Sequence, residues 1–284
     1  MDAVAIGPSL REAWIDDLLR LPDRGGFEVL EIMVDDYLCP THRPKELRRL
    51  GARWALVAHG VALGVGDADG VDEAYVAEVH ATLRALHVWW WSDHLAFLRA
   101  GGVDLGHFAP LDGAEDTLEV LRRNAARARE GAPCALLLEN PADVLGLGAW
   151  SAEACCPHES GAALGARYRE ALRAAGTGAL LDLTNLLYDA RNGGFDPIAY
   201  LDALELDRVV QVHLAGGREA FGLWIDSHDR PVEADALALL AHLAPHAPNL
   251  RAVTVEWDEA LPDLDGMRAE LARVDAVLRE AGRR

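Results

Sequence analysis

The sequence predicts an α/β fold, a single (β/α)8 TIM barrel that spans residues 1–284. Short apolar runs of strand length alternate with longer stretches of helical period along the whole chain, which is typical of repeated βα units. Of the 284 residues, 51% are hydrophobic, which is enough for the core of one such barrel. No linker or low-complexity segment divides the sequence, so we expect one domain.

Eight strands are predicted, which is the number that this closed barrel needs. Runs such as Ala-Leu-Leu-Leu at 135–138 and Val-Val-Gln-Val at 209–212 are apolar on both faces, as parallel strands buried between two layers are. The predicted strands are residues 4–7, 27–33, 55–58, 88–91, 135–138, 179–181, 209–212 and 252–255. Eight strands in a chain of this length fit one closed barrel better than an open sheet with a second domain.

Helices are predicted between these strands, at residues 9–21, 71–86, 114–130, 161–175, 197–203, 235–243 and 264–280. Ser9, Asp196 and Asp263 are predicted N-caps, because their side chains can accept a hydrogen bond from the first helical turn. Residues 143–165 are rich in glycine and alanine and are predicted to form a long βα loop, a kind of segment that often carries function.

The charge balance narrows the classes of partner. The 46 acidic and 27 basic residues give a formal net charge of -19, which repels phosphate backbones and anionic membrane surfaces, so we expect no nucleic-acid or membrane partner. The sequence shows no signal-peptide pattern and no apolar run of spanning length, so we expect a cytoplasmic location. The four cysteines form no CxxC pair, and Cys155 and Cys156 beside His158 are only a minor candidate for a metal or redox site.

Six consecutive predicted strands each lead to a His, Asp or Glu near their carboxyl end. These residues are His59, His94, Glu139, Asp182, His213 and Glu256, and a loop beyond the seventh strand adds Asp226 and His228. Because barrel enzymes build their sites at this end of the strands, the side chains are expected to converge. Converging carboxylates in a partly buried site need cations between them. The sequence therefore predicts a multinuclear metal centre, and such ligands without thiolate suit iron, manganese or zinc.

Each of these residues has a simpler interpretation when it is taken alone. A lone histidine at a strand end is more often a hydrogen-bonded structural residue, and a lone carboxylate there can cap a helix. The coincidence of eight such residues favours metal binding. The other histidines lie in predicted helices or loops without this placement and are expected to be surface or core residues: His42, His80, His87, His107, His158, His242 and His246.

The motifs between His59 and Pro262 have a recognisable order. They are His59-Gly60-Val61 with Leu63-Gly64, Ser92-Asp93-His94-Leu95, Glu139-Asn140-Pro141, Leu181-Asp182-Leu183-Thr184-Asn185, Asn192-x-Gly194-Phe195-Asp196, His213-Leu214-Ala215-Gly216, Ile225-Asp226-Ser227-His228 and Glu256-Trp257-Asp258. Together they resemble the multinuclear non-haem iron-dependent oxidases, the relatives of the iron subunit that modifies cysteines in methanobactin biosynthesis.

This resemblance implies a xylose-isomerase-like TIM barrel that activates dioxygen as co-substrate at two or three iron ions, in a mixed Fe(II)/Fe(III) state. It also implies a ribosomally made precursor peptide as substrate, often modified at cysteine, and a small partner protein that presents the peptide leader. The implied ligand sets are His59, His94 and Glu139 for the first ion; Glu139, Asp182, His213 and Glu256 for the second; and Asp226 and His228 for the third.

The sequence departs from the pattern of this family at three places. Asn185 stands where some relatives have a histidine, so Asn185 is only a possible ligand and the third site is expected to be labile or differently occupied. The family often has an Arg-x-x-His-like segment after the first strand, which is absent from residues 7–14 here, and its usual histidine after His-Leu-Ala-Gly is Gly217 here. Both of these changes concern substrate handling more than metal binding.

Four residues are candidate substrate contacts: Asn140, Asn192, Asp35 and Asp36. A structural turn role is the alternative for each asparagine, as it is for Asn185. The two aspartates follow the second predicted strand, at the same rim as the ligands.

Three other functions stay open. A trinuclear zinc hydrolase resembling endonuclease IV has this barrel and ligand order, but its pattern has a histidine at the place of Asn185, and a DNA substrate conflicts with the acidic charge balance. A sugar isomerase with two divalent ions is a further option that the Asp-His-Leu and His-Leu-Ala-Gly signatures fit less well. The third is a metal-binding partner subunit without turnover.

Overall fold

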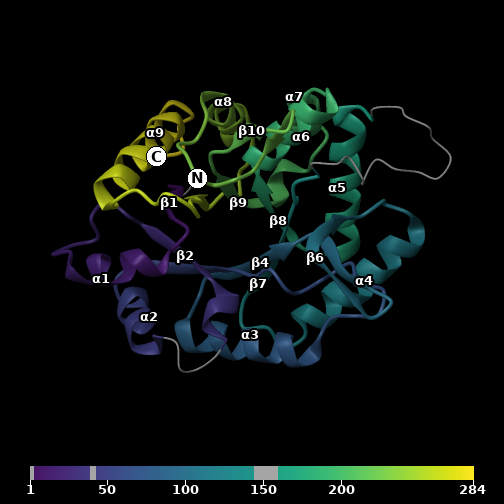
Figure 1. Ribbon diagram of the computed structural model, residues 1–284, viewed down its shortest axis with the longest axis horizontal. Helices are drawn as coiled ribbons and strands as arrows, with labels where there is room; N and C mark the ends of the chain where they lie inside the picture. The colour runs from purple at the N-terminus through teal and green to yellow at the C-terminus, as the bar shows by residue number, and fades with distance from the viewer. Residues whose placement is uncertain (1–2, 39–42, 144–158) are drawn as a thin grey trace.

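The structure, a computed structural model, describes residues 3–38, 43–143 and 159–284. Eight parallel strands form one sheet in the order β1-β12-β9-β8-β7-β4-β3-β2, and the helices surround it (Figure 1). The strands of this sheet are β1 (Ala5–Pro8), β2 (Val29–Met33), β3 (Ala55–His59), β4 (Trp90–His94), β7 (Ala135–Glu139), β8 (Gly178–Asp182), β9 (Val209–Leu214) and β12 (Ala252–Val255).

The two end strands of this order, β1 and β2, meet and bring the sheet round into a barrel. Ser9 forms a parallel bridge with Glu31, and the Leu10 N–H donates to the Glu31 carbonyl at 2.6 Å. Gly7 permits this approach, because a Cβ atom there would lie 1.7 Å from the carbonyl oxygen of Val29. The predicted (β/α)8 barrel is thus confirmed, and the fourth strand extends to His94 instead of ending at residue 91.

Seven helices lie at the predicted places: α1 (Glu12–Arg20), α3 (Glu73–Leu86), α4 (Glu115–Arg129), α5 (Gly161–Ala175), α7 (Pro197–Asp202), α8 (Ala234–Leu243) and α9 (Leu264–Glu280). The Asp196 and Asp263 side chains cap α7 and α9 as predicted. The prediction for Ser9 was wrong, because α1 begins at Glu12. Ser9 still belongs to the barrel ladder, where its N–H donates to the Val255 carbonyl at 2.9 Å.

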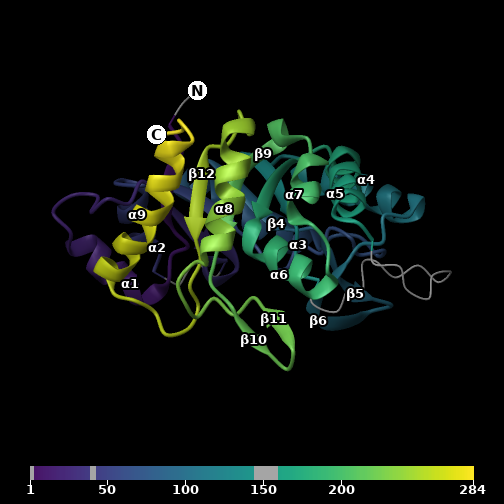
Figure 2. The ribbon, with the colours of Figure 1, turned by 90° about the horizontal axis from the view of Figure 1, so that it is seen from above.

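Several elements among the described residues were not predicted. They are the helices α2 (Pro44–Gly51) and α6 (Leu183–Gly193), three short 3-10 turns (Val34–Tyr37, Leu206–Arg208 and Ala244–His246) and the hairpins β5 (Ala96–Ala100) with β6 (Val103–Pro110) and β10 (Arg218–Ala220) with β11 (Leu223–Ile225). Both hairpins project at the carboxyl end of the barrel strands, along the lower edge of Figure 2. The centre of the predicted loop at 143–165, with Cys155, Cys156 and His158, lies outside the described residues, as does His42.

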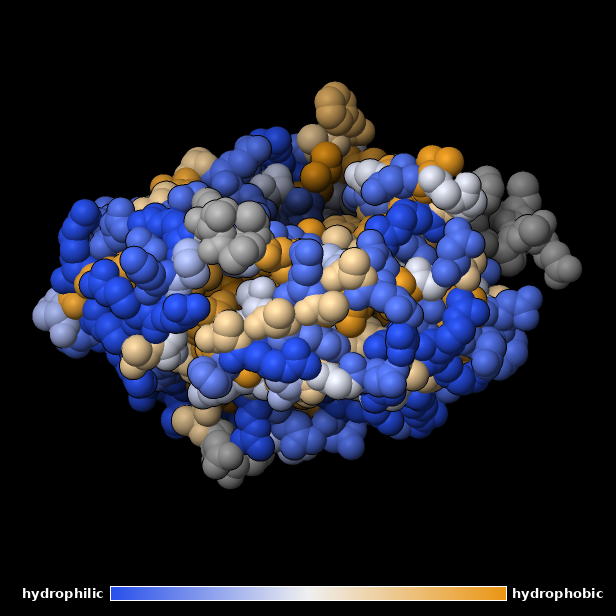
Figure 3. Space-filling view, turned by 90° about the horizontal axis from the view of Figure 1, so that it is seen from below, coloured by the Kyte–Doolittle hydropathy of each residue, from blue (hydrophilic) through white to orange (hydrophobic). Residues whose placement is uncertain are grey.

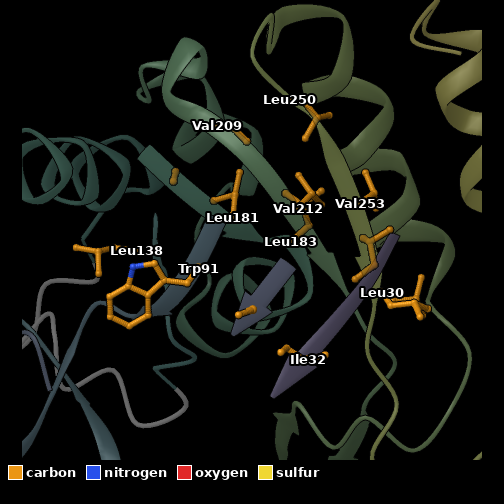
Figure 4. Packing of buried hydrophobic residues seen from close by; sticks show 14 of the residues in the cluster. Leu30, Ile32, Trp91, Leu138, Leu181, Leu183, Val209, Val212, Leu250 and Val253 are labelled. Atoms are coloured by element: carbon orange, nitrogen blue, oxygen red, sulfur yellow. The ribbon is translucent and has the colours of Figure 1, made fainter. Parts of the chain in front are cut away.

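The strands carry two apolar clusters because successive side chains point to opposite faces. Residues such as Leu30, Trp91, Leu138 and Leu181 belong to the larger cluster, which continues into the helices (Figure 4). A smaller cluster consists of strand residues one position out of phase with these: Val29, Val57, Trp90, Leu137, Leu180 and Ala252. The smaller cluster fills the inside of the barrel and forms a floor beneath its carboxyl end.

The outer surface is mostly hydrophilic, with hydrophobic groups standing out along the upper edge of Figure 3. Large exposed hydrophobic side chains include Val103 and Leu105 on β6 and Phe221 at the β10–β11 turn. Within the described part of the chain, no helix has the length and apolar character that a membrane span requires.

Candidate metal centre

The period of two along each strand carries the floor residues and the predicted ligands to the same face. On β3, for example, Val57 belongs to the floor and His59 stands two positions further toward the carboxyl end. The parallel register aligns these ends, since His94 pairs with Glu139 and Asp182 pairs with His213. Polar side chains from six strands therefore gather above the floor, at the barrel end where the prediction placed them.

Two groups of side chains each offer ligand atoms within 4.8 Å of one another: His59, His94 and Glu139 in the first, and Glu139, Asp182, His213 and Glu256 in the second. Glu139 belongs to both groups. Six of the eight predicted ligands are thus brought together, and all six are buried or nearly so.

In the first group, both imidazoles turn Nε2 toward Glu139. The Nε2 atoms of His59 and His94 lie 3.2 Å and 3.5 Å from Oε2 of Glu139. Nδ1 of His59 lies 2.9 Å from the Ser92 hydroxyl, which itself donates to the Ala58 carbonyl at 3.2 Å. Nδ1 of His59 must then be the donor to Ser92, which leaves a lone pair on Nε2 facing Glu139. Burial lowers the pKa of His59 well below its ordinary value, and the nearby His94 and His213 lower it further. A neutral imidazole is the form that binds a metal ion.

In the second group, His213 lies between two carboxylates. Its Nδ1 atom is 3.0 Å from Oε2 of Glu256 and 3.5 Å from Oε1 of Glu139. Burial lowers the pKa of His213, but Glu256, Glu31 and Glu139 raise it well above its ordinary value. Burial also raises the pKa of Asp182 well above its ordinary value, and the charges of Asp226 and Glu139 add to this. Protons on these two side chains offset part of the negative charge, and a cation would offset it in their place.

Orphaned polar atoms show that the residues fit a metal ion. Among the described side chains, the buried atoms without a hydrogen-bond partner include Oε2 of Glu139, Oδ2 of Asp182 and Nδ1 of His213, which all belong to the second group. Buried polar atoms normally have a hydrogen-bond partner, and three orphans this close together are unusual. A bound cation would give these nitrogen and oxygen atoms a common partner.

Asp226 and His228 lie beside the second group but outside the two groups defined above. Nε2 of His228 is 2.6 Å from Oδ2 of Asp226 and 3.9 Å from Oε2 of Glu256. The other ring nitrogen, Nδ1, lies 2.8 Å from Asp258, which in turn accepts a hydrogen bond from Nε of Arg11 at 2.9 Å. His228 has a positive φ of 49°, a strained conformation that its backbone contact with Asp258 helps to hold.

The three asparagines hold neighbouring backbone. Asn140 donates to the Asp182 carbonyl at 2.9 Å and accepts from the Asp182 N–H at 2.8 Å, and Asn192 makes the same pair of bonds with the backbone of Trp224. Asn185 donates to the Asn140 carbonyl at 3.2 Å, whereas its Oδ1 atom is buried and without a hydrogen-bond partner. Asn140 and Asn192 thus have clear structural roles, and Asn185 keeps a free oxygen near Asp182.

The two aspartates after β2 differ in exposure. Asp35 is partly buried and accepts from the Val61 N–H at 2.9 Å, and burial together with the nearby Asp93 raises its pKa. Asp36 is exposed. Gly217, for which the family resemblance implied a histidine, has no room for a side chain, because a Cβ atom there would lie 2.3 Å from the Ile225 carbonyl oxygen.

Four residues that support the centre were not predicted: Glu31, Ser92, Phe108 and Asp258. Phe108 on β6 stacks on the His94 ring, with centroids 3.7 Å apart and an interplanar angle of 13°. Glu31 had a visible signal, since it is a single acidic residue within an otherwise apolar strand. His80 and His242 lie outside the centre as expected: His80 is buried and bonds to the Ala128 carbonyl, and His242 pairs with Asp202 near the surface.

Comparison with known families decides where the chain belongs. A model of the family described as RiPP precursor modification enzyme MbnB/TglH/ChrH matches residues 5–279. The chain belongs to this family. RiPPs are ribosomally made, post-translationally modified peptides. The match over residues 5–279 confirms the family resemblance inferred from the motifs.

Two bacterial proteins illustrate how similar the relatives of this chain are to it. A UPF0276 protein from Rhizorhabdus wittichii is 33% identical over 276 residues, which cover 95% of this chain and 94% of the relative. A UPF0276 protein from Streptomyces avermitilis is 32% identical over 292 residues, which cover the whole of this chain but 57% of the relative. The chain thus spans little more than half the length of the second protein.

Solved structures share the fold of this family member. A 3-keto-D-glucoside 4-epimerase from E. coli has a TM-score of 0.59 at 13% identity and covers 96% of this chain and 99% of that one. Endonuclease IV from Thermus thermophilus has a TM-score of 0.57 at 18% identity, covering 97% and 99%. A xylose isomerase domain protein from Planctomyces limnophilus has a TM-score of 0.56 at 15% identity, covering 98% and 97%. At such identities the likeness concerns the barrel alone.

Proposed function

We propose that this protein is a multinuclear non-haem iron enzyme that uses dioxygen to oxidise residues of a ribosomally made precursor peptide, chiefly cysteine. The observation that carries the proposal is the sharing of Glu139 by two ligand groups, because a carboxylate with both oxygens turned to imidazoles suits a bridge between two ions. Membership of a peptide-modifying family supports the peptide substrate.

The ligand types support iron over a structural zinc site. The two groups offer imidazole and carboxylate atoms as ligands. Among the described residues the cysteine is Cys134, and it cannot supply a thiolate to the centre because it precedes the amino end of β7, at the opposite end of the barrel. Iron bound in the two groups would supply electrons to dioxygen and a binding site for the thiolate of the substrate. We assign His59, His94 and Glu139 to the first ion and Glu139, Asp182, His213 and Glu256 to the second.

Asp226 and His228 would hold a third ion next to the second one. Asn185 supplies an amide oxygen on this side, which is a weaker ligand than an imidazole nitrogen, so we expect the third ion to exchange more readily. Asp258, which accepts a hydrogen bond from Arg11, contacts Nδ1 of His228 and so fixes the orientation of its ring.

The chain's own residues would also keep solvent away from the centre and present the peptide to it. The Phe108 ring covers one face of His94, and exposed hydrophobic side chains on both hairpins stand around the same rim: Val103, Leu105 and Phe221. Such groups suit contact with an apolar stretch of the peptide or with a small leader-binding partner protein. Asp35 and Asp36 lie beyond β2 at this end and are proposed as minor substrate contacts.

Metal analysis and oxygen uptake test the proposal together. Protein purified without oxygen should contain more than one iron ion per chain, and should consume dioxygen only with a cysteine-containing precursor peptide and its partner protein. Full occupancy by zinc with phosphodiesterase activity would replace the proposal with a zinc hydrolase. Bound iron without turnover of any co-expressed peptide would replace it with a metal-binding partner subunit.

A further inference from the structure

The inside of the barrel holds a buried carboxylate, Glu31, that belongs to neither ligand group. It lies on β2, is fully buried, and has His213 as its ion-pair partner among the described residues. Its Oε2 atom is 2.9 Å from Nε2 of His213 and also accepts a hydrogen bond from the side-chain amide of Gln211. A buried carboxylate that meets no lysine or arginine is costly, so its contact with His213 calls for a function.

Gln211 fixes which groups donate in this contact. The indole N–H of Trp90 in the floor of the barrel lies 2.5 Å from Oε1 of Gln211, and an indole nitrogen can only donate. Oε1 of Gln211 is therefore the acceptor for Trp90, and the amide NH2 group faces Glu31 and the Thr254 hydroxyl. Oε2 of Glu31 consequently acts as an acceptor, which directs the proton of the imidazole to Nε2 of His213.

The two nitrogens of His213 then have different roles. In the neutral imidazole, the form that binds a metal ion, Nε2 donates to Glu31 and Nδ1 keeps its lone pair on the side of Glu139 and Glu256. Without Glu31, a neutral His213 could carry its proton on Nδ1 and donate to these carboxylates. That arrangement would compete with a cation for the same space.

We propose that Glu31 is a positioning residue that holds His213 as an Nδ1 ligand and makes its imidazole a stronger electron donor. The proposal rests on the proposed metal centre. A carboxylate that accepts the second N–H of a metal-bound imidazole orients the ring and raises its basicity. Its negative charge also favours the ferric over the ferrous state of the ion that His213 binds.

The substitution Glu31→Gln tests this, with Glu270→Gln as the matched control. Glu270 is also a buried glutamate, but it bonds to the Val232 N–H and to Arg273, away from the centre. We expect Glu31→Gln to raise the Zn(II) dissociation constant of the full chain about 10- to 100-fold in competition with a chelator. It should also raise the Fe(III)/Fe(II) midpoint potential, which a purely structural role would not move. Glu270→Gln should leave both values unchanged.

A measurement on the unaltered protein guards against a variant that fails to fold. In the Zn(II)-loaded chain, long-range proton–nitrogen NMR should show His213 protonated at Nε2 and coordinated through Nδ1. Coordination through Nε2, or a folded Glu31→Gln variant with unchanged affinity and potential, would overturn the role of Glu31. If the unaltered chain bound no metal ion at all, the proposed function itself would fail.

Discussion

Glu139 is the residue on which the two ligand groups depend, because its Oε2 atom faces His59 and its Oε1 atom faces His213. We expect Glu139→Gln to lower the occupancy of both ions, since an amide offers one neutral oxygen in place of two charged ones. Asp182→Asn should lower the occupancy of the second ion alone, and it keeps the oxygen that caps α6. Elemental analysis of both variants after identical iron loading measures this difference. Equal losses in the two variants would contradict the shared role of Glu139.

Single residues also show how far the sequence could predict the centre. His59 and Asp182 were found because each ends a recognisable apolar strand, and parallel strands carry their ends to one rim. Glu31 could not be placed in the same way, because its partner His213 lies 182 positions further along the chain. Although β2 pairs with β3, only closure of the barrel between β1 and β2 brings β2 near β9, the strand that carries His213.

At the scale of elements, the β5–β6 hairpin covers one side of the metal centre, because Phe108 stacks on the His94 ring. Loss of this ring should leave His94 free to rotate and open it to water. We therefore expect Phe108→Ala to weaken binding of the first ion several-fold in a Co(II) titration. Val103→Ala, at the exposed end of the same hairpin, is the control and should bind Co(II) as the unaltered protein does. Equal weakening by both changes would mean that the hairpin acts through its own stability and not through His94.

Two of the elements that sequence analysis missed have identifiable and different physical causes. Helix α6 follows β8 without a loop, and Asp182 both ends the strand and caps the helix, so no turn residues mark the boundary. The β10–β11 hairpin has strands of three residues each, too short to show an alternating pattern. Six of the seven predicted helices, in contrast, have nine or more residues, and the short α7 has a clear N-cap in Asp196.

For the whole molecule, alternation along the strands explains how one barrel serves stability and chemistry together. Side chains that face outward join the helices in the large apolar cluster, whereas those that face inward form an apolar floor below and polar ligands above. The sequence could predict the barrel because eight apolar runs of this kind rarely suit another fold. It could not predict how the inward layers fit together, since Gln211 contacts both Trp90 and Glu31 only in the closed barrel.

Cation binding should also stabilise the whole barrel, because the ligands come from six strands and meet only in the folded state. At a free Zn(II) concentration about 100 times the dissociation constant, the expected gain is about 2.7 kcal/mol for one ion. For a domain of this size that corresponds to a rise in Tm of about 5 to 10 °C. Calorimetry of the metal-free chain with and without Zn(II) measures the rise. His242→Ala, outside the centre, should show the full rise, and Glu139→Gln little of it. An equal rise in both variants would mean that Zn(II) stabilises the protein from another site.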